Sequence, residues 1–303
     1  SPAHGILRGQ EEAAASNTGS CDGPPVPAVH VETSRPDFRG PMLWWQAFAR
    51  KIGLHHQTTS EGLVRRFVTL EPGRPCTEFR RSESERILRA QPYLADATVT
   101  AQRHGDSVRI IVSTVDEVSV VAGARLRGAS VQALSLGTLN FQGAGLNVVG
   151  RWEQGRALRD GFGARIAHHQ VLGRPYSVLL DGQRHPLGEY YSTQLSHPFI
   201  TDLQRIAWHA GYSVSKNFAS LRRAPPDRAQ LLQPVDRALW NVGGVLRFGP
   251  PRRLGLIGGM VLYERQVPRH DFLVMDEAGA VHPAPDTTGV RRYDIFDATN
   301  AAG

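Results

Sequence analysis

Histidine pairs are the first residues of this 303-residue chain that suggest chemistry. His55-His56 and His168-His169 are adjacent in sequence, and His185 and His197 form a looser pair. Imidazole is a common zinc ligand, but neighbouring residues of a strand point to opposite faces, so an adjacent pair does not chelate a metal alone. We therefore expect exposed imidazoles and no metal site.

Asp181 and Glu189 are the candidates for a pair of catalytic carboxylates. Both lie near expected turns and lack the apolar shielding that would raise a carboxyl pKa, so acid–base chemistry is not expected there. The chain has neither a Gly-x-Ser-x-Gly nucleophile elbow nor a phosphate-binding loop. We predict that the protein is not an enzyme and takes no cofactor.

Arginine carries nearly all the basic charge of the chain. The formal net charge is +7, and Lys51 and Lys216 are the only lysines. Arginine binds phosphate through two parallel hydrogen bonds, which suits nucleic acid or anionic lipid headgroups. No arginine cluster forms a nucleic-acid motif, so we expect no nucleic-acid partner.

The two cysteines, Cys21 and Cys76, are too few for a disulfide scaffold. Cys76 precedes an expected helix and is predicted to be a small buried apolar residue. We expect no bridge between the two.

The first third of the chain predicts a leader followed by a small domain. Residues 1–41 are rich in Gly, Pro, Ala, Ser and charge, and are predicted to be flexible. Residues 42–117 show a β-α-α-β-β pattern that begins with a short strand at 54–59. Ser60 and Thr77 are candidate N-caps of the two helices.

The second helix and the hairpin complete this pattern. Glu85 and Arg89 form an i,i+4 pair in the favourable order, and Pro92 ends the helix. An antiparallel hairpin is expected around His104-Gly105-Asp106. We predict a small α+β domain in which the helices pack on the sheet.

From about Val118 the periodicity changes to 2 and stays there to about Gln266, in about nine segments separated by turn residues. Phe162 and Ile166 face one way and Arg165 the other. Two folds have this pattern: a soluble antiparallel sheet with one wet face, and a membrane barrel with a polar lumen. Segments of about 8 to 13 residues favour the barrel, because soluble strands are shorter.

Two further features accompany these strands. Aromatic residues are expected near strand ends, where an interfacial girdle would lie: Trp152, Tyr176, Tyr190, Tyr191, Trp208, Tyr212, Trp240 and Tyr263. The longest loop is expected over 222–234.

The sequence then resembles a known family. The segments "GLVRRFVTLEPGRPC" and "SESERILRAQPYLADATV" resemble a POTRA domain of the outer-membrane assembly and translocation family, the BamA/TamA type. "LNFQGAG", with Asn140, Gly143 and Gly145, resembles the first barrel hairpin of that family, and "LSHPFITD" a later turn on the periplasmic side.

The resemblance implies an α+β POTRA domain followed by an antiparallel up-and-down transmembrane β-barrel over 118–303. Family barrels have sixteen strands and about nine are counted here, so it also implies a truncated member or one that assembles with other chains. No stretch of 18 apolar residues occurs. The implied location is the bacterial outer membrane, with the POTRA domain in the periplasm.

Two strand edges are the predicted partner sites. An extended client strand can add to the exposed edge of the POTRA sheet; the residues are Ala97, Thr98, Val99, Thr100, Ala101 and Gln102. A barrel seam is expected at Ser119, Val120, Val121, Ala122, Gly123 and Ala124. The expected partners are outer-membrane protein clients or a periplasmic partner, and the lipid bilayer.

The predicted function is assembly, insertion or translocation of outer-membrane proteins. The alternatives are a barrel that serves as membrane anchor or secretion pore of a larger protein, for example with a lipase upstream, and a soluble lipid-binding β-protein.

Overall fold

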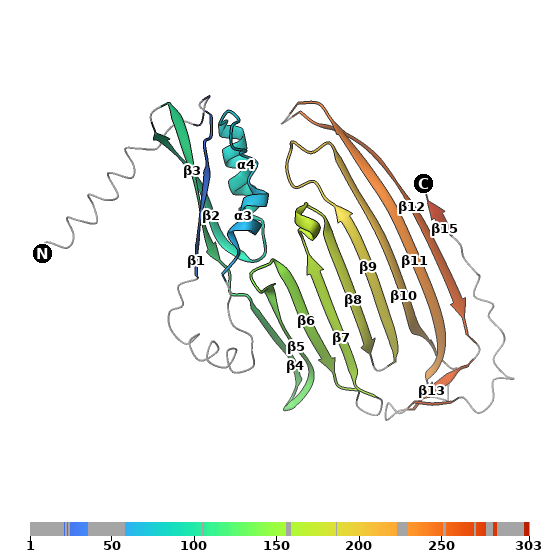
Figure 1. The fold of residues 1–303 in the computed structure, drawn as a ribbon. Coiled ribbons are helices and arrows are strands. Elements are labelled where there is room, and N and C mark those ends of the chain that lie inside the picture. The colour runs from blue at the N-terminus through green and yellow to red at the C-terminus, as the bar shows by residue number, and fades with distance from the viewer. Residues whose placement is uncertain are drawn as a thin grey trace, which may run out of the picture. The chain divides into compact units, whose positions relative to one another are not determined.

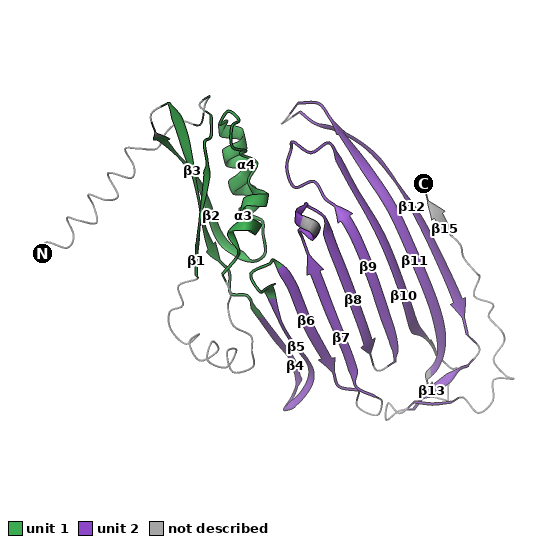
Figure 2. Ribbon diagram, in the orientation of Figure 1, with its two compact units in different colours: residues 1–120, 139–145 green, residues 121–138, 146–303 purple. Residues whose placement is uncertain are grey.

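A computed structural model describes residues 21, 23, 25–35, 58–104, 106–155, 159–185, 187–222, 230–250, 253–269, 271–276, 281–283 and 300–302. The chain forms two compact units (Figure 2). Unit 1 comprises residues 1–120 and 139–145, and unit 2 comprises residues 121–138 and 146–303. The predicted pattern of long strands is found in unit 2, and both helices belong to unit 1.

Unit 1 is a three-stranded sheet with two helices (Figure 1). Its elements are β1 (Val29–Ser34), α3 (Glu61–Phe67), α4 (Glu78–Arg89), β2 (Leu94–His104) and β3 (Ser107–Asp116). The strand order is β1-β3-β2, with β1 parallel and β2 antiparallel to β3. The element order is therefore β-α-α-β-β, although its first strand is not the one that the sequence predicts.

The helices begin where the sequence predicts. Ser60 and Thr77 are the N-caps, and each side chain accepts a hydrogen bond from a backbone N–H three residues on. Leu63, Val64 and Phe67 of α3 are buried. The core of the unit lies between these side chains and the alternating buried residues of β3, such as Val108, Ile110 and Val112.

The first strand of unit 1 corrects two predictions. Val29–Ser34, inside the expected flexible leader, form β1 and pair with β3. Val29 and Val31 are 8% exposed each and point into the core, and the exposed residue His30 lies between them, so the segment has the period of 2 of a strand. The strand expected at 54–59 is not found at Thr58 or Thr59, and 54–57 lie outside the described residues.

A disulfide joins Cys21 to Cys76, contrary to the prediction. Both cysteines are buried, at 1% and 0% exposure, and their Cα atoms are 4.9 Å apart. The bridge holds the segment before β1 against the segment before α4. Gly23 N–H donates to the Cys76 carbonyl at 3.1 Å beside it. Disulfides persist in oxidising compartments such as the periplasm.

Unit 2 contains most of a twelve-stranded sheet. Its strands are β4 (Val120–Arg127), β5 (Ser130–Phe141), β6 (Leu146–Glu153), β7 (Gly161–His168), β8 (Ser177–His185), β9 (Gly188–His197), β10 (Ile206–Arg222), β11 (Gln230–Phe248), β12 (Gly255–Pro268), β13 (Leu273–Met275), β14 (Val281–Pro283) and β15 (Asn300–Ala302). All nine predicted segments are strands, from β4 to β12.

Consecutive strands from β4 to β12 are neighbours, which makes an antiparallel meander. β4 stands at one end of the order, and within the described residues it pairs with β5 alone. β15 pairs with β12 at the other end. In the described part of the chain the sheet is therefore an open path. None of the helices in that part is long and apolar enough to cross a membrane.

The β10–β11 hairpin corrects the predicted long loop at 222–234. β10 continues to Arg222 and β11 starts at Gln230, so most of the second half of that stretch is strand. Leu231 and Leu232 are 4% and 3% exposed. Leu231 and Leu232 pair with Val274 and Leu273 of β13, so the sheet extends into this stretch despite its polar and Pro residues.

Candidate functional site

The sheet of unit 2 has two chemically different faces from β6 to β12. Directly opposed residues of antiparallel strands share a face. The register therefore places one row of residues after another on the same side, for example Leu195, Ala210, Val242 and Val261. We call the side with these residues the apolar face and the other side the polar face.

The apolar face carries most of the large exposed apolar side chains of β6–β12. They are Phe162, Ile166, Leu180, Tyr191, Leu195, Ile206, Tyr212, Trp240, Val242, Leu246, Phe248, Ile257, Val261 and Val267. The exceptions, which lie on the polar face, are Tyr190, Leu256 and Met260. A water-soluble surface seldom gathers so many exposed apolar side chains in one patch.

The polar face carries ion pairs and amide side chains. Arg151 pairs with Asp181, and Arg237 Nε lies 2.6 Å from Glu264 Oε1. The same face also carries Gln183, Ser192, Gln194, Asn241 and Gln266. Phe162 and Ile166 on one face and Arg165 on the other confirm the predicted alternation.

The height of the apolar face matches a bilayer. On β11 it runs from Ala238 to Phe248, and Asp236 follows on the same side. Ten residue steps of about 3.4 Å give about 34 Å along the strand. At the usual barrel tilt of about 35–45° this is close to the ~25 Å apolar band of outer-membrane barrels.

Aromatic side chains form a row across the apolar face. Tyr212, Trp240 and Tyr263 are neighbours on β10, β11 and β12, and the rings of the last two stack with centroids 5.7 Å apart. The sequence predicts Trp240 near a strand end, but β10 and β11 continue beyond this row, so Trp240 lies within β11. At the opposite limit of the face, Tyr176 lies beside His197 at 5.3 Å between ring centroids.

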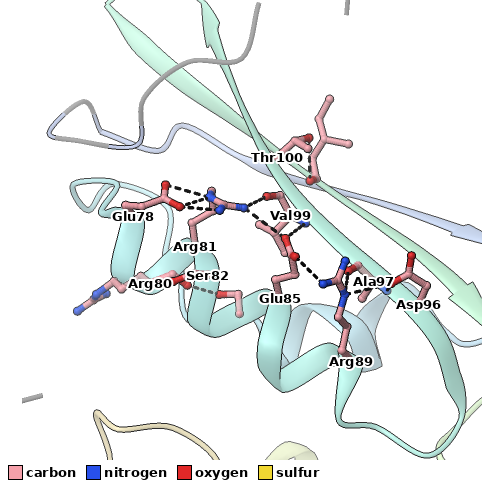
Figure 3. Close-up of polar contacts among 12 residues, drawn as sticks. Glu78, Arg80, Arg81, Ser82, Glu85, Arg89, Asp96, Ala97, Val99 and Thr100 are labelled. Atoms are coloured by element: carbon pink, nitrogen blue, oxygen red, sulfur yellow. Dashed lines mark hydrogen bonds and ion pairs between the residues drawn. The ribbon is translucent and has the colours of Figure 1, made fainter. Parts of the chain in front are cut away.

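The edge of β2, the first predicted partner site, is hydrogen-bonded by side chains of α4 (Figure 3). Glu85 Oε2 accepts from the Val99 N–H at 3.1 Å, and Arg81 Nη1 donates to the Val99 carbonyl at 2.5 Å. Arg89 Nε donates to the Ala97 carbonyl at 2.8 Å. Because α4 supplies these partners, the outward backbone groups of Ala97 and Val99 are not open to an added strand.

The remaining predicted edge residues differ in what they expose. Thr98, Thr100 and Gln102 direct their backbone groups to β3, since residues of an antiparallel strand alternate between its two sides. Within the described residues, no hydrogen bond reaches the outward N–H and C=O of Ala101. The partner-binding edge stays a prediction, and its free groups begin at Ala101.

Ion pairs hold in place the arginines that cover the β2 edge. We call Arg81, Glu85 and Arg89 together the edge cap, or the cap. Arg81 Nη2 lies 2.5 Å from Glu78 Oε1 and Arg81 Nη1 lies 3.3 Å from Glu85. Arg89 Nη1 lies 3.1 Å from Glu85, which confirms the predicted i,i+4 pair. The hydrogen bond with Glu78, more than the charge of Glu85, raises the pKa of Arg81, so this guanidinium is charged at every accessible pH.

The second predicted partner site lies on the end strand of the sheet. Val120 to Ala124 belong to β4, and Ser119 precedes it with 3% exposure. The carbonyl of Ser119 accepts from the Leu139 N–H at 2.7 Å. β4 has an edge without a described partner strand, and the seam remains a prediction.

The turn between β5 and β6 belongs to unit 1, a feature that the sequence did not reveal. Asn140, 2% exposed, donates from Nδ2 to Thr59 Oγ1 at 2.8 Å and accepts at Oδ1 from the Gly145 N–H at 2.7 Å. The Ser60 N–H donates to the Gly143 carbonyl at 3.0 Å. The only sequence signal was the Asn-Phe-Gln-Gly-Ala-Gly turn itself.

Tyr93 lies beside this turn. A Cβ added to Gly145 would meet Tyr93 Cε1 at 3.1 Å, so glycine allows the close approach. Tyr93 is 1% exposed, and burial, with a smaller contribution from the Asp116 charge, raises the pKa of its hydroxyl. Asp116 Oδ2 in turn accepts from the Thr59 N–H at 2.9 Å. The turn therefore completes a buried polar cluster.

The structure does not bring together the carboxylates and histidines that the sequence offers as catalytic or metal-binding candidates. Asp181 lies on the polar face and Glu189 on the apolar face of neighbouring strands. His168 points to the apolar face with Leu146, and His169 follows β7 and contacts Ser177 Oγ at 3.3 Å. His55-His56 lie outside the described residues. The described ranges hold no group of three or more His, Cys, Asp or Glu suited to a metal.

Comparison with known proteins gives a weak structural likeness. No protein-family model matches the chain, and no curated protein matches it in sequence. Among solved structures it is similar to the crystal structure of BamA from Haemophilus ducreyi lacking POTRA domains 1–3, with 10% identity and a TM-score of 0.39. The similarity covers 71% of this chain and 48% of that chain. The strands and faces above, not this likeness, carry the conclusions that follow.

Proposed function

We propose that the protein is an outer-membrane β-barrel protein with a periplasmic POTRA module, which acts in the assembly, insertion or translocation of outer-membrane proteins. The apolar face of unit 2 carries the proposal. Its exposed side chains, from Phe162 on β7 to Val261 on β12, need an apolar environment, and its height fits a bilayer.

Three further observations support the location and the module. The polar face of β6–β12 suits a water-filled lumen. The Cys21–Cys76 disulfide suits an oxidising compartment such as the periplasm. The β-α-α-β-β order of unit 1 is the order that the POTRA resemblance implies.

The membrane part of the proposal is tested by refolding the full chain in detergent and in lipid vesicles. A membrane-spanning sheet should migrate differently on a gel before and after boiling, and should stay with vesicles washed in alkaline carbonate. A monomer that remains in solution without detergent would contradict it.

The assembly part needs a separate measurement. Vesicles that contain the protein should accelerate the insertion of a small client barrel relative to empty vesicles. Stable insertion of the protein without any effect on the client would instead favour a membrane anchor or secretion pore. The closed edge at Ala97 and Val99 favours that second candidate, because it withdraws backbone groups from strand addition.

A further inference from the structure

A line of charged side chains crosses unit 2 at the limit of the apolar face. It has one member on each of four neighbouring strands: Arg184 on β8, Glu189 on β9, Lys216 on β10 and Asp236 on β11. Each is directly opposite the next, so all four project to the apolar side of the sheet. We call these four residues the charged row.

The charged row contains its own ion pair and is neutral by itself, and two neighbouring arginines, Arg265 and Arg269, give this region a cationic excess. Lys216 Nζ lies 2.6 Å from Glu189 Oε1, and Arg269 Nη1 lies 3.8 Å from Asp236 Oδ2. Arg184 and Arg265 are exposed, and neither has an ion pair within the described residues. These two guanidinium groups are free to bind an anion.

A shallow hollow joins the row to the apolar face. Arg265 on β12 is opposite Ala238, two residues inward from Asp236 on β11. The hollow has apolar walls at Tyr191, Val214 and Val267, and its charged lining residues are Glu189, Lys216, Asp236, Arg237 and Arg265. One part of the lining is therefore charged and another part is apolar. A lipid has the same two parts where its charged headgroup joins its acyl chains.

The position of the row fixes the depth at which it meets lipid. Arg or Lys on the lipid face of a barrel costs about 2–4 kcal/mol at the midplane and about 0–1 kcal/mol near the interface. A row of four charges on the apolar side is therefore compatible with a membrane only at headgroup level. In the meander this is the end of the sheet opposite the β5–β6 turn.

We propose that Arg184, Lys216 and Arg265 bind the phosphate groups of an anionic lipid whose first acyl carbons lie in the hollow. Guanidinium groups bind phosphate through paired hydrogen bonds, which the unpaired Arg184 and Arg265 can supply. This inference rests on the proposed membrane function, because the row meets headgroups only if the apolar face meets acyl chains.

The test uses the full chain inserted into vesicles of phosphatidylcholine mixed with cardiolipin, an anionic lipid with two phosphate groups. After mild detergent extraction, native mass spectrometry counts the cardiolipin that remains bound. A basic residue near an anionic surface contributes about fivefold to binding, so Arg265→Gln should lower retention about fivefold and Arg184→Gln with Arg265→Gln about 25-fold.

The matched control removes the same charge elsewhere. Arg109 is an exposed residue of β3 in unit 1, and Arg165 lies on the polar face of unit 2. The double variant Arg109→Gln with Arg165→Gln should leave lipid retention unchanged. Equal retention in the two double variants would overturn the proposal. Failure of the parent chain to insert into any vesicle would instead contradict the proposed function.

Discussion

Asn140 shows how one buried side chain fixes a turn. Its amide bridges Thr59 and the Gly145 N–H inside unit 1, where water does not reach either partner. Asn140→Ala leaves both groups without this partner, and we expect unit 1 to lose about 2 to 4 kcal/mol of unfolding free energy. Hydrogen exchange at the amides of Ser60 and Gly145 measures the loss locally.

A control for Asn140 lies in β10. Asn217 is exposed, and within the described residues its side chain donates to Ser215 Oγ alone, at 3.2 Å. Asn217→Ala should change stability by less than about 0.5 kcal/mol. If both variants leave the exchange at Ser60 and Gly145 unchanged, the Asn140 amide does not hold the turn.

At the scale of elements, α4 closes part of the β2 edge. Glu85 accepts from Val99 and pairs with both Arg81 and Arg89, so Glu85→Ala removes the common partner of the cap. Loss of a hydrogen bond to a charged group is worth about 1.5–3 kcal/mol. We expect exchange of the Val99 amide to accelerate at least tenfold, and strand-forming peptides to bind unit 1 more tightly.

Glu71→Ala is the matched control for the cap. Glu71 pairs with Arg74 at 2.8 Å, and both side chains are more than half exposed. This variant should leave Val99 exchange at the parental rate. Faster exchange in both variants would mean that general loosening, and not the cap, governs the edge.

The disulfide links the segment before β1 to the segment before α4. Its cysteines are 55 residues apart, and a cross-link that closes such a loop stabilises a domain by about 4 kcal/mol in the chain-entropy account. Urea unfolding of unit 1, followed by exchange at Ile110 and Val112, should shift to lower urea when the protein is reduced. The Cys21→Ser variant should unfold at the same urea concentration with or without reductant.

Element by element, periodicity and capping predicted most of the fold. Ser60, Thr77 and the alternation around Phe162 and Arg165 are local signals, because each depends on residues within one turn or strand. The misses depend on distant partners. Val29–Ser34 is a strand because β3 pairs with it. Cys21 bonds Cys76 where the backbone of Gly23 and Val26 hydrogen-bonds to residues 73–76.

The candidate sites follow the same division. Periodicity predicted the two faces of unit 2, since a side chain's face depends only on its place in the strand. It did not predict the cap on Val99, because Glu85 and Arg81 reach β2 through helix packing. The charged row also needs the register of four strands, which no single segment encodes.

At the scale of the whole molecule, the apolar face decides between membrane and water. Val242 lies near the middle of that face on β11 and is 53% exposed, and the neighbouring Asn241 lies on the polar face. In a bilayer, Val242→Arg places a cation near the midplane and should cost about 2 to 4 kcal/mol in insertion. The fraction of heat-modifiable protein formed in vesicles, titrated with urea, measures this cost.

Asn241→Arg introduces the same charge one residue away, toward the proposed lumen, where water hydrates it. It should change insertion by well under the cost of Val242→Arg. In a protein that folds in water, both arginines would be exposed and would behave alike, so equal urea midpoints for the two variants would remove the physical basis of the membrane assignment. A large gap between adjacent residues requires hydrocarbon on one side of β11 and water on the other.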